Sequence, residues 1–222
     1  MLRVEKLKAG PQPALSFEVA DGKCLAVVGP SGAGKTRLLR AIADLDPSGG
    51  RVFLDGAERS EVPATQWRAW VRYCAAEPAW WSETPRTGIW FESPHGGVVQ
   101  AGTRDKLAGD KRLQRLLSSV GLSASHLDRP ISALSTGERQ RLGIVRALLD
   151  DPKVVLFDEP TASLDSANSA LIDELVKFLL LAGRTILLVS HDPRQIERLA
   201  HARLQLTQVE PLQAPADLGA QS

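Results

Sequence analysis

An apolar run, a glycine-rich loop and an amphipathic segment follow one another directly in residues 24–44, and this order restricts the possible folds more than any other feature. Residues 24–28 are apolar and lead into Gly29, which predicts a buried strand that ends in a tight turn. Residues 35–44 place Leu38, Leu39 and Ile42 on one face, as an amphipathic helix does. A buried strand joined in this way to a helix favours a parallel sheet covered by helices.

Two more apolar runs, residues 154–157 and 185–189, predict further buried strands, and residues 165–181 between them predict a helix. Strands that alternate with helices predict an α/β fold with a mostly parallel sheet. In such sheets, ligands bind beyond the carboxyl ends of the strands. The predicted strands are followed by Gly29, Asp158 and His191, so all three ends carry residues capable of chemistry.

Residues 29–36 match the phosphate-binding pattern G-x-x-x-x-G-K-[ST]. The glycines let backbone N–H groups surround phosphate oxygens, and the next helix directs its positive end at the same anion. Lys35 is expected to reach the β- and γ-phosphates and Thr36 to bind Mg²⁺. A glycine turn that matches by accident is the alternative. The place of the loop between a strand and a helix favours a nucleotide site built by Gly29, Pro30, Ser31, Gly32, Ala33, Gly34, Lys35 and Thr36.

Two carboxylates, Asp158 and Glu159, close the apolar run of residues 154–157. An aspartate at the end of a buried strand can hold Mg²⁺, often through water. Glu159 is placed to polarise an attacking water. The alternative, two acids that cap the next element, loses weight behind a complete phosphate loop. The sequence therefore predicts a site for a nucleoside triphosphate and Mg²⁺.

Ser135 and Glu138 match the S-x-x-E capping box at the start of a helix. The free N–H groups of a helix start also form an anion site. The segment is therefore a capped amphipathic helix, either with or without a phosphate contact. The helix is expected to bury apolar residues at helical spacing: Leu142, Val145 and Leu148 or Leu149. Its arginines are expected elsewhere on its surface: Arg139, Arg141 and Arg146.

Residues 134–141 (LSTGERQR) resemble the signature motif of the ATP-binding-cassette (ABC) ATPases, usually LSGGQ followed by basic and glutamine residues. Residues 154–160 likewise resemble the family's Walker B motif with its catalytic glutamate, residues 163–165 its D-loop and residues 190–192 its switch histidine. The resemblance covers residues 2–206 and implies one ABC ATPase domain at residues 1–206. This domain would have a P-loop NTPase core (residues 1–76 and 134–206), an N-terminal antiparallel β portion and an inserted helical subdomain (residues 77–133). Residues 207–222 are expected to form a mobile tail.

The resemblance also implies a dimer that closes around two ATP molecules. In the family, the signature of one copy closes over the ATP held by the other, which here would involve Ser135, Gly137 and Glu138. Thr136 stands where glycine is commoner in the family. Asp158 and Thr36 would hold Mg²⁺, and the histidine would hydrogen-bond the γ-phosphate. The catalytic roles would fall to Lys35, Glu159 and His191.

Two positions depart from the family's pattern. The Q-loop glutamine, which touches Mg²⁺ and senses the membrane subunit, aligns with Ala76, which has no polar side-chain atom. Either coupling runs differently or Glu77 takes the role as a Mg²⁺ ligand, and we favour Glu77. The aromatic residue that stacks on adenine is expected near Gly10 or Pro11, where none occurs, and Phe17 is the nearest. The selectivity for the base is therefore left open.

All five tryptophans lie between residues 67 and 90, a region that lines the groove for the membrane subunit in the family. Trp67 and Trp70 are three positions apart and are expected to pack inside the protein. Trp80 and Trp81 are expected in the docking groove, since tryptophan is enriched in binding hot spots.

The chain has 222 residues with 27 Lys and Arg and 26 Asp and Glu, a net charge of +1, which argues against nucleic-acid binding. Its two cysteines, Cys24 and Cys74, have no metal-like spacing and indicate a reduced compartment, although a disulfide stays open. The sequence predicts neither a signal peptide nor a membrane helix, which needs ~18–20 apolar residues. We expect a cytoplasmic protein, held on the cytoplasmic face of the inner membrane by a separate multi-span subunit.

These observations favour the ATP-hydrolysing subunit of a bacterial ABC transporter. Residues 73–75 resemble the corresponding strand of bacterial iron-export ATPases. The alternatives are an ABC ATPase that drives a membrane complex without moving a solute, a soluble ABC ATPase of DNA repair or translation, and a nucleotide-binding adaptor. The sequence lacks the coiled coils and zinc modules usual in repair and translation proteins. The adaptor is suggested by Ala76 and the missing aromatic, and opposed by the intact Lys35, Asp158, Glu159 and His191.

Overall fold

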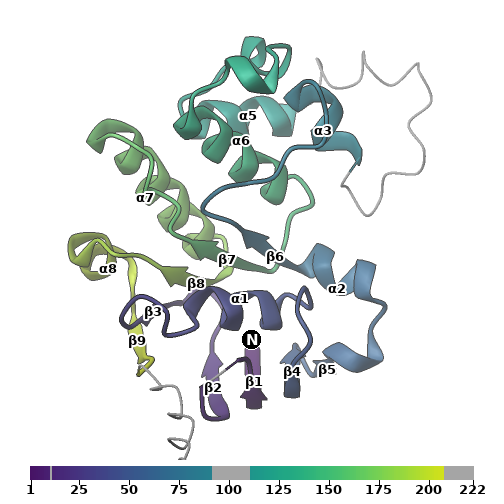
Figure 1. Cartoon of the computed structure of the whole chain (residues 1–222), viewed down its shortest axis with the longest axis vertical. Helices are drawn as coiled ribbons and strands as arrows, with labels where there is room; N and C mark the ends of the chain where they lie inside the picture. The colour runs from purple at the N-terminus through teal and green to yellow at the C-terminus, as the bar shows by residue number, and fades with distance from the viewer. Residues whose placement is uncertain (11, 92–110, 208–222) are drawn as a thin grey trace, which may run out of the picture.

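The computed structural model describes residues 1–10, 12–91 and 111–207. Figure 1 shows two sheets in the lower half of the molecule and a group of helices above them. Pro11, residues 92–110 of the predicted helical subdomain and residues 208–222 of the predicted tail lie outside the described residues.

The N-terminal part of the chain forms an antiparallel sheet in the order β2-β1-β4-β5. Leu2, Val4 and Leu7 of its central strand β1 are buried, while the residues between them are wholly or partly exposed. This alternation, with a shift after Val4, is that of a sheet with one covered face. The predicted antiparallel portion is confirmed, with the strands β1 (Leu2–Lys8), β2 (Leu15–Val19), β4 (Gly49–Leu54) and β5 (Ala57–Glu58).

The second sheet has the order β6-β7-β8-β3-β9, and all its pairings are parallel. Every residue of β7 and β8 is buried, as expected for strands covered on both faces. The predicted α/β fold with a parallel sheet is therefore confirmed. Its strands are β3 (Cys24–Val28), β6 (Val71–Cys74), β7 (Val154–Asp158), β8 (Thr185–Val189) and β9 (Ala202–Gln205).

Helices cover both faces of the parallel sheet (Figure 1). Among the described residues, no helix combines the length and apolarity needed to cross a bilayer. The α-helices are α1 (Lys35–Ile42), α2 (Ala64–Trp70), α3 (Pro85–Phe91), α5 (Lys111–Ser119), α6 (Thr136–Leu148), α7 (Ser166–Leu181) and α8 (Pro193–Leu199). Short 3-10 turns are η1 (Arg59–Glu61), η3 (Ala124–Leu127) and η4 (Ile131–Ala133).

The side chains of β7 alternate between two hydrophobic cores. Val154 and Leu156 belong to the core shared by α1 and the antiparallel sheet. Val155 and Phe157 belong to the core shared by α5, α6 and α7. Both cysteines are free thiols in the core of α5, α6 and α7, and burial raises the pKa of each to about 12. The parallel sheet thus joins the two halves of the molecule.

Helix α6 corrects one expectation, because Arg141 is not on the surface but 7% exposed. The helix contacts β6 on one side and α5 on another, so few of its faces remain free. Burial lowers the pKa of Arg141, while the negative charges of Glu138 and Asp165 act in the opposite direction. The apolar positions predicted for this helix are buried as expected: Leu142, Val145 and Leu148.

Trp67 lies fully inside the core of α1 and the antiparallel sheet. Its Nε1 donates a hydrogen bond to the carbonyl oxygen of Ile42, at the end of α1, at 2.9 Å. Trp70 is half-buried against the same core, so the expectation of an interior position holds fully only for Trp67. The indole of Trp67 therefore ties α2 to α1, the helix that follows the phosphate-binding loop.

Replacing Trp67 by Phe removes this hydrogen bond and part of a filled volume. We expect Trp67→Phe to lower the free energy of unfolding by about 2 kcal/mol, measured by chemical denaturation. Trp81→Phe is the matched control, since the side chain of Trp81 is 84% exposed and the same replacement there should leave the stability unchanged. Equal stability losses in both variants would contradict the role of the Trp67 contact.

Candidate functional site

The phosphate-binding loop leads from the end of β3 into the start of α1. Gly29 has a φ of 155°, and a Cβ at this residue would lie 2.6 Å from the carbonyl oxygen of Leu206. Gly34 caps α1 with a φ of 88°, a left-handed conformation that favours glycine. The first N–H groups of α1 have no partner within the helix, which makes this end suited to an anion.

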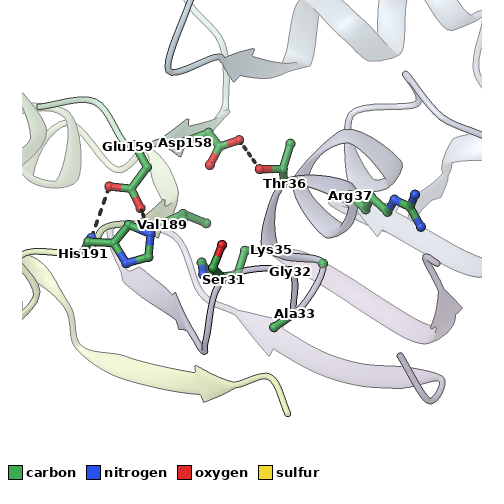
Figure 2. Close-up of a pocket in the computed structure, with 11 residues that line it drawn as sticks. Ser31, Gly32, Ala33, Lys35, Thr36, Arg37, Asp158, Glu159, Val189 and His191 are labelled. Carbon is green, nitrogen blue, oxygen red and sulfur yellow. Dashed lines mark hydrogen bonds and ion pairs between the residues drawn. The ribbon is translucent and has the colours of Figure 1, made fainter. Parts of the chain in front are cut away.

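A pocket of about 430 Å³ lies over this loop, at the carboxyl edge of the parallel sheet (Figure 2). Residues 31–37 of the loop and of α1 form one side of it. Asp158 and Glu159 at the end of β7 and Val189 and His191 at the end of β8 form the other side. The three strand ends to which the sequence assigned chemistry therefore meet at one pocket.

The side chain of Lys35 is buried within the loop. Its Nζ donates hydrogen bonds to the carbonyl oxygens of Gly29 at 2.8 Å and Pro30 at 3.0 Å. A buried ammonium group needs such partners. The same group is one of the pocket's lining residues, so an anion bound over the loop would be within its reach.

Asp158 is 4% exposed and carries two hydroxyl donors on a single oxygen. Its Oδ2 accepts from Thr36 Oγ1 at 2.7 Å and from Tyr73 Oη at 2.8 Å. Burial raises the pKa of the Tyr73 hydroxyl, and the charge of Asp158 adds to this, so the tyrosine stays a donor. The carboxylate thus joins α1, β6 and β7 at the floor of the pocket.

The oxygens of Thr36 and Asp158 fit a Mg²⁺ ion. Mg²⁺ prefers hard oxygen ligands and takes only one or two carboxylates, with water and phosphate oxygens completing its shell. In residues 1–10, 12–91 and 111–207 no group of three or more acidic, histidine or cysteine side chains could hold a metal by itself. The donor set therefore suits a metal that arrives together with a phosphate.

Glu159 has a φ of 50°, a left-handed conformation that is uncommon outside glycine. Two contacts hold its backbone in this conformation. Its N–H donates to the carbonyl oxygen of Val189 at 3.0 Å, and its own carbonyl oxygen accepts from Gln140 Nε2 at 2.8 Å. The local strain, of order 1–3 kcal/mol, is thus offset by the neighbouring strand and by α6.

The carboxylate of Glu159 faces His191 (Figure 2). Its Oε2 accepts from the backbone N–H of His191 at 3.1 Å. Its Oε1 lies 3.2 Å from His191 Nε2, an ion pair when the ring is protonated, and otherwise this buried oxygen has no hydrogen-bond donor. The Oε1 of Glu159 is therefore buried against His191 and keeps unused acceptor capacity.

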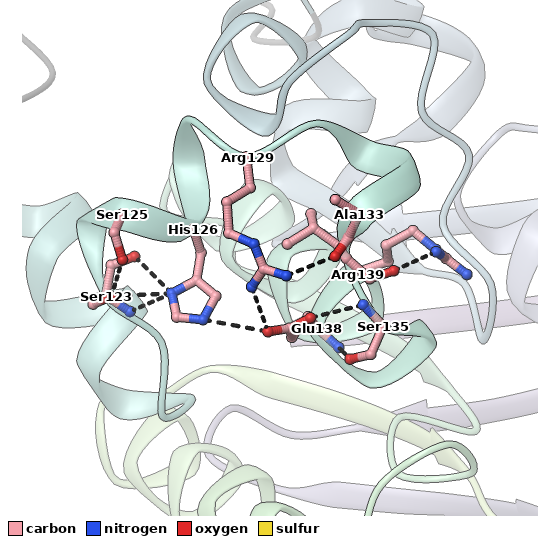
Figure 3. A network of polar contacts seen from close by, with 9 residues as sticks. Ser123, Ser125, His126, Arg129, Ala133, Ser135, Glu138 and Arg139 are labelled. Carbon is pink, nitrogen blue, oxygen red and sulfur yellow. Dashed lines mark hydrogen bonds and ion pairs between the residues drawn. The ribbon is translucent and has the colours of Figure 1, made fainter.

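The predicted capping box at the start of α6 is present (Figure 3). Ser135 Oγ accepts from the N–H of Glu138 at 3.2 Å, and the N–H of Ser135 donates to Glu138 Oε2 at 2.7 Å. The second carboxylate oxygen accepts from Arg129 Nη1 at 2.9 Å. The backbone hydrogen bond from Ser135, followed by the contacts of its hydroxyl and of Arg129, lowers the pKa of Glu138 to about 2. Glu138 thus fixes the helix start.

The signature residues do not complete the pocket of their own chain. Ser135, Gly137 and Glu138 are not among the residues that line it. A Cβ at Gly137 would lie 2.9 Å from Leu164 Cδ2 and 3.0 Å from the carbonyl oxygen of Ser163. Gly137 is therefore needed for contact with the loop of residues 163–165, a role within the chain that the sequence did not show.

The segment after β6 carries the predicted Q-loop and docking residues, and the structure places them in different environments. Ala76 and Glu77 do not line the pocket, and Glu77 is exposed. Trp80 packs against the core of α5, α6 and α7, with the guanidinium of Arg146 4.3 Å from its ring. Trp81, by contrast, is 84% exposed. Trp81 is thus available at the surface and Trp80 is half-buried, while the docking groove itself stays a prediction.

Three residues support the site through contacts that the sequence analysis did not predict. Tyr73 binds Asp158, and Gln140 binds the backbone of Glu159. Gln12, which is 3% exposed, donates through Nε2 to the carbonyl oxygens of Ala33 at 2.6 Å and Thr207 at 2.5 Å, and so braces the phosphate-binding loop. Each of these contacts joins segments distant in sequence, which explains why local patterns gave no signal.

Comparison with known proteins agrees with this geometry. The family model described as ABC transporter matches residues 13–162. The methionine import ATP-binding protein MetN of Geobacillus kaustophilus is 35% identical over 195 residues, which are 83% of this chain and 54% of that protein. The Nod factor export ATP-binding protein I of Ralstonia nicotianae is 34% identical over 192 residues, 83% of this chain and 56% of that protein. The chain thus spans about half the length of these relatives.

Among solved structures, the dimeric structure of a bacterial ABC transporter cassette has the same fold, with a TM-score of 0.78 and 23% identity over 93% of this chain and 94% of that one. The family model covers well over half of this chain, and it includes both the phosphate-binding loop and the carboxylate pair. The chain belongs to the ABC transporter family.

Proposed function

We propose that this protein is the ATP-hydrolysing subunit of an ABC transporter and that two copies close around two ATP molecules. One observation carries the proposal. Lys35, the Thr36–Asp158 pair and the Glu159–His191 pair all face a single pocket at the carboxyl edge of the parallel sheet. An anion-binding loop, a metal-compatible oxygen pair and a base beside it are the parts that phosphoryl transfer to water needs.

The residues divide the work of hydrolysis. The loop N–H groups and Lys35 bind the β- and γ-phosphates, while Thr36 and Asp158 would hold Mg²⁺. Mg²⁺, when bound, neutralises charge on the phosphate oxygens. The carboxylate of Glu159 would accept a hydrogen bond from the attacking water and orient it, once its Oε1 turns from His191 toward the pocket. His191 then contacts the γ-phosphate from the side of β8.

The signature supports the pairing of two copies. Ser135 is exposed at the start of α6, and the signature does not line its own pocket. The N-terminus of α6 thus offers N–H groups to a ligand that its own chain does not bring there. A second copy that places its γ-phosphate at this helix start would complete both sites at once. The dimeric cassette of the same fold is consistent with this arrangement.

A separate membrane subunit would receive the motion of the dimer. Trp81, exposed directly after a core-packed Trp80, is the residue we assign to the contact. Large exposed aromatic side chains are typical of binding hot spots. We place the chain on the cytoplasmic face of the membrane through this partner. Glu77, exposed on the same segment, stays our candidate for the Q-loop role, since Ala76 has no polar atom.

The cargo does not follow from the relatives. One is named for methionine import and another for Nod factor export, so similarity to this chain is compatible with either direction. Neither name concerns iron, and the iron-export subtype suggested by residues 73–75 has no support from these relatives.

Glu159→Gln should trap the closed dimer, because the amide keeps the shape of the side chain but orients water poorly. We expect a dimer with ATP and Mg²⁺ and a monomer with ADP or without nucleotide, measured by light scattering after size exclusion. Glu174→Gln, an exposed residue on α7, is the control and should behave as the wild type. A Glu159→Gln variant that stays monomeric at saturating ATP would contradict the two-copy mechanism.

Tyr73→Phe should weaken the metal site without changing the fold around it, because it removes one of the two donors on Asp158 Oδ2. Loss of such an outer contact should raise the Mn²⁺ or Mg²⁺ concentration for half-saturation of the ATP complex about tenfold. The measurement is Mn²⁺ binding by electron paramagnetic resonance, with ATP affinity in EDTA as the internal control. If metal binding is unchanged, Tyr73 does not position Asp158.

Trp81→Ala should release the membrane partner from the chain. We expect recovery of a multi-span protein with the tagged chain from detergent-solubilised membranes to fall by about tenfold or more, since a hot-spot residue contributes about 2 kcal/mol. Phe178→Ala is the matched control, because Phe178 is an exposed aromatic residue on α7, away from this segment. Undiminished recovery with Trp81→Ala would place the docking surface elsewhere.

A further inference from the structure

Asp173 is a buried carboxylate in α7, 4% exposed, with donors on both of its oxygens. Its Oδ1 accepts from Gln195 Nε2 at 2.7 Å, and its Oδ2 accepts from Arg198 Nε at 2.9 Å and Nη2 at 2.5 Å. Gln195 is itself only 1% exposed. A buried charge is tolerated only where partners of this kind surround it. Asp173, Gln195 and Arg198, here called the Asp173 cluster, fix α8 against α7.

One end of the Asp173 cluster reaches the loop that follows Glu159. Gln195 Oε1 accepts from Thr161 Oγ1 at 3.4 Å. Thr161 stands two positions after Glu159, and a turn ties the two together, since the N–H of Ala162 donates to the carbonyl oxygen of Glu159 at 3.3 Å. The amide of Gln195 therefore bridges from the buried carboxylate to the chain that carries the proposed base.

The other end of the cluster reaches the loop that carries His191. Arg198 Nη2 lies 3.9 Å from Asp192 Oδ2, and Asp192 directly follows His191. Asp192 also caps α8, since its Oδ1 accepts from the N–H of Arg194 at 2.9 Å. The guanidinium of Arg198 thus lies between the buried carboxylate of Asp173 and the cap of the helix that begins beside His191.

A cleft of about 800 Å³ lies beside these contacts, and Thr161, Asp173 and Asp192 are among its lining residues. Glu159 and His191 line this cleft as well as the nucleotide pocket, so the pair forms a wall between the two. The Asp173 cluster thus contacts both loops that carry this wall.

We propose that Asp173 is a positioning residue for hydrolysis, which holds the loops after Glu159 and around His191 in one fixed relation. The proposal rests on the proposed function, because it assigns Asp173 to the same site. The carboxylate acts through Gln195 and Arg198 and touches neither nucleotide nor water. Its loss lets Glu159 and His191 move independently, which misaligns the water but leaves the phosphate-binding loop intact.

Asp173→Asn tests this, because it keeps the size of the side chain and removes the charge that binds Arg198. With the full chain we expect kcat for ATP hydrolysis to fall about tenfold, while KM stays within about twofold. Nucleotide-binding stoichiometry is measured in the same sample, and kcat is expressed per binding-competent site. Glu174→Gln is the matched control. It removes the same charge from the neighbouring residue, whose ion pair with Lys177 is exposed. It should keep the wild-type kcat.

Thr161→Val is the second variant, since it breaks the loop end of the network without disturbing the buried carboxylate. Thr161→Val should also lower kcat. In the double variant with Asp173→Asn, the further fall in kcat should be smaller than the fall that Thr161→Val causes alone. An unchanged kcat per binding site in Asp173→Asn overturns the proposal, as does a fall that only matches a loss of binding-competent protein. The wild-type chain distinguishes failure of this proposal from failure of the proposed function. If the wild-type chain does not hydrolyse ATP, the proposed function itself is overturned.

Discussion

The parallel pairing of β3, β8 and β7 is the constraint on which the site depends. Asp158 pairs with Val189 and Ala26 with Leu188, so the three strands reach the same edge of the sheet nearly level with one another. The segments that follow the strands therefore begin at this edge, which brings Gly29, Asp158 and His191 close together. The burial of β7 and β8 on both faces holds this register, because a shift by one residue would exchange the side chains of the two cores.

Buried charges at this edge are stabilised mainly by neutral hydrogen-bonding groups rather than by opposite charges. Lys35 is held by two carbonyl oxygens, and Asp158 by the hydroxyls of Thr36 and Tyr73. Such partners satisfy the charges without neutralising them, so a cationic group and an anionic group both remain available to a phosphate and its metal. Asp173 differs, because its buried carboxylate forms an ion pair with Arg198. This ion pair connects α7 to α8 and does not line the nucleotide pocket. In the proposed mechanism, the groups with neutral partners bind the nucleotide and its metal, and Asp173 positions the neighbouring loops.

Local patterns in the sequence identified the strand–loop–helix order, the capping box and most of the residues that line the pocket. These are short-range features, in which neighbouring residues dictate their own conformation, as in the Ser135–Glu138 cap. Contacts between distant segments gave no such signal. Tyr73 and Asp158 are 85 positions apart, and Gln12 and Thr207 are 195 apart. Arg141 was misplaced for the same reason, because a charged residue on an amphipathic helix is expected at the surface unless the packing of other elements is known.

The packing of α6 connects the signature residues to the proposed base of the same chain. Gly137 admits the loop of residues 163–165 at its side, and Gln140, one turn further along the helix, holds the carbonyl oxygen of Glu159. The start of α6 is therefore linked to the backbone of the proposed base through one buried amide. If a second copy binds its phosphate at this helix start, the same event that closes the dimer also fixes Glu159. Hydrolysis would then be restricted to the closed pair by the rigidity of a single helix.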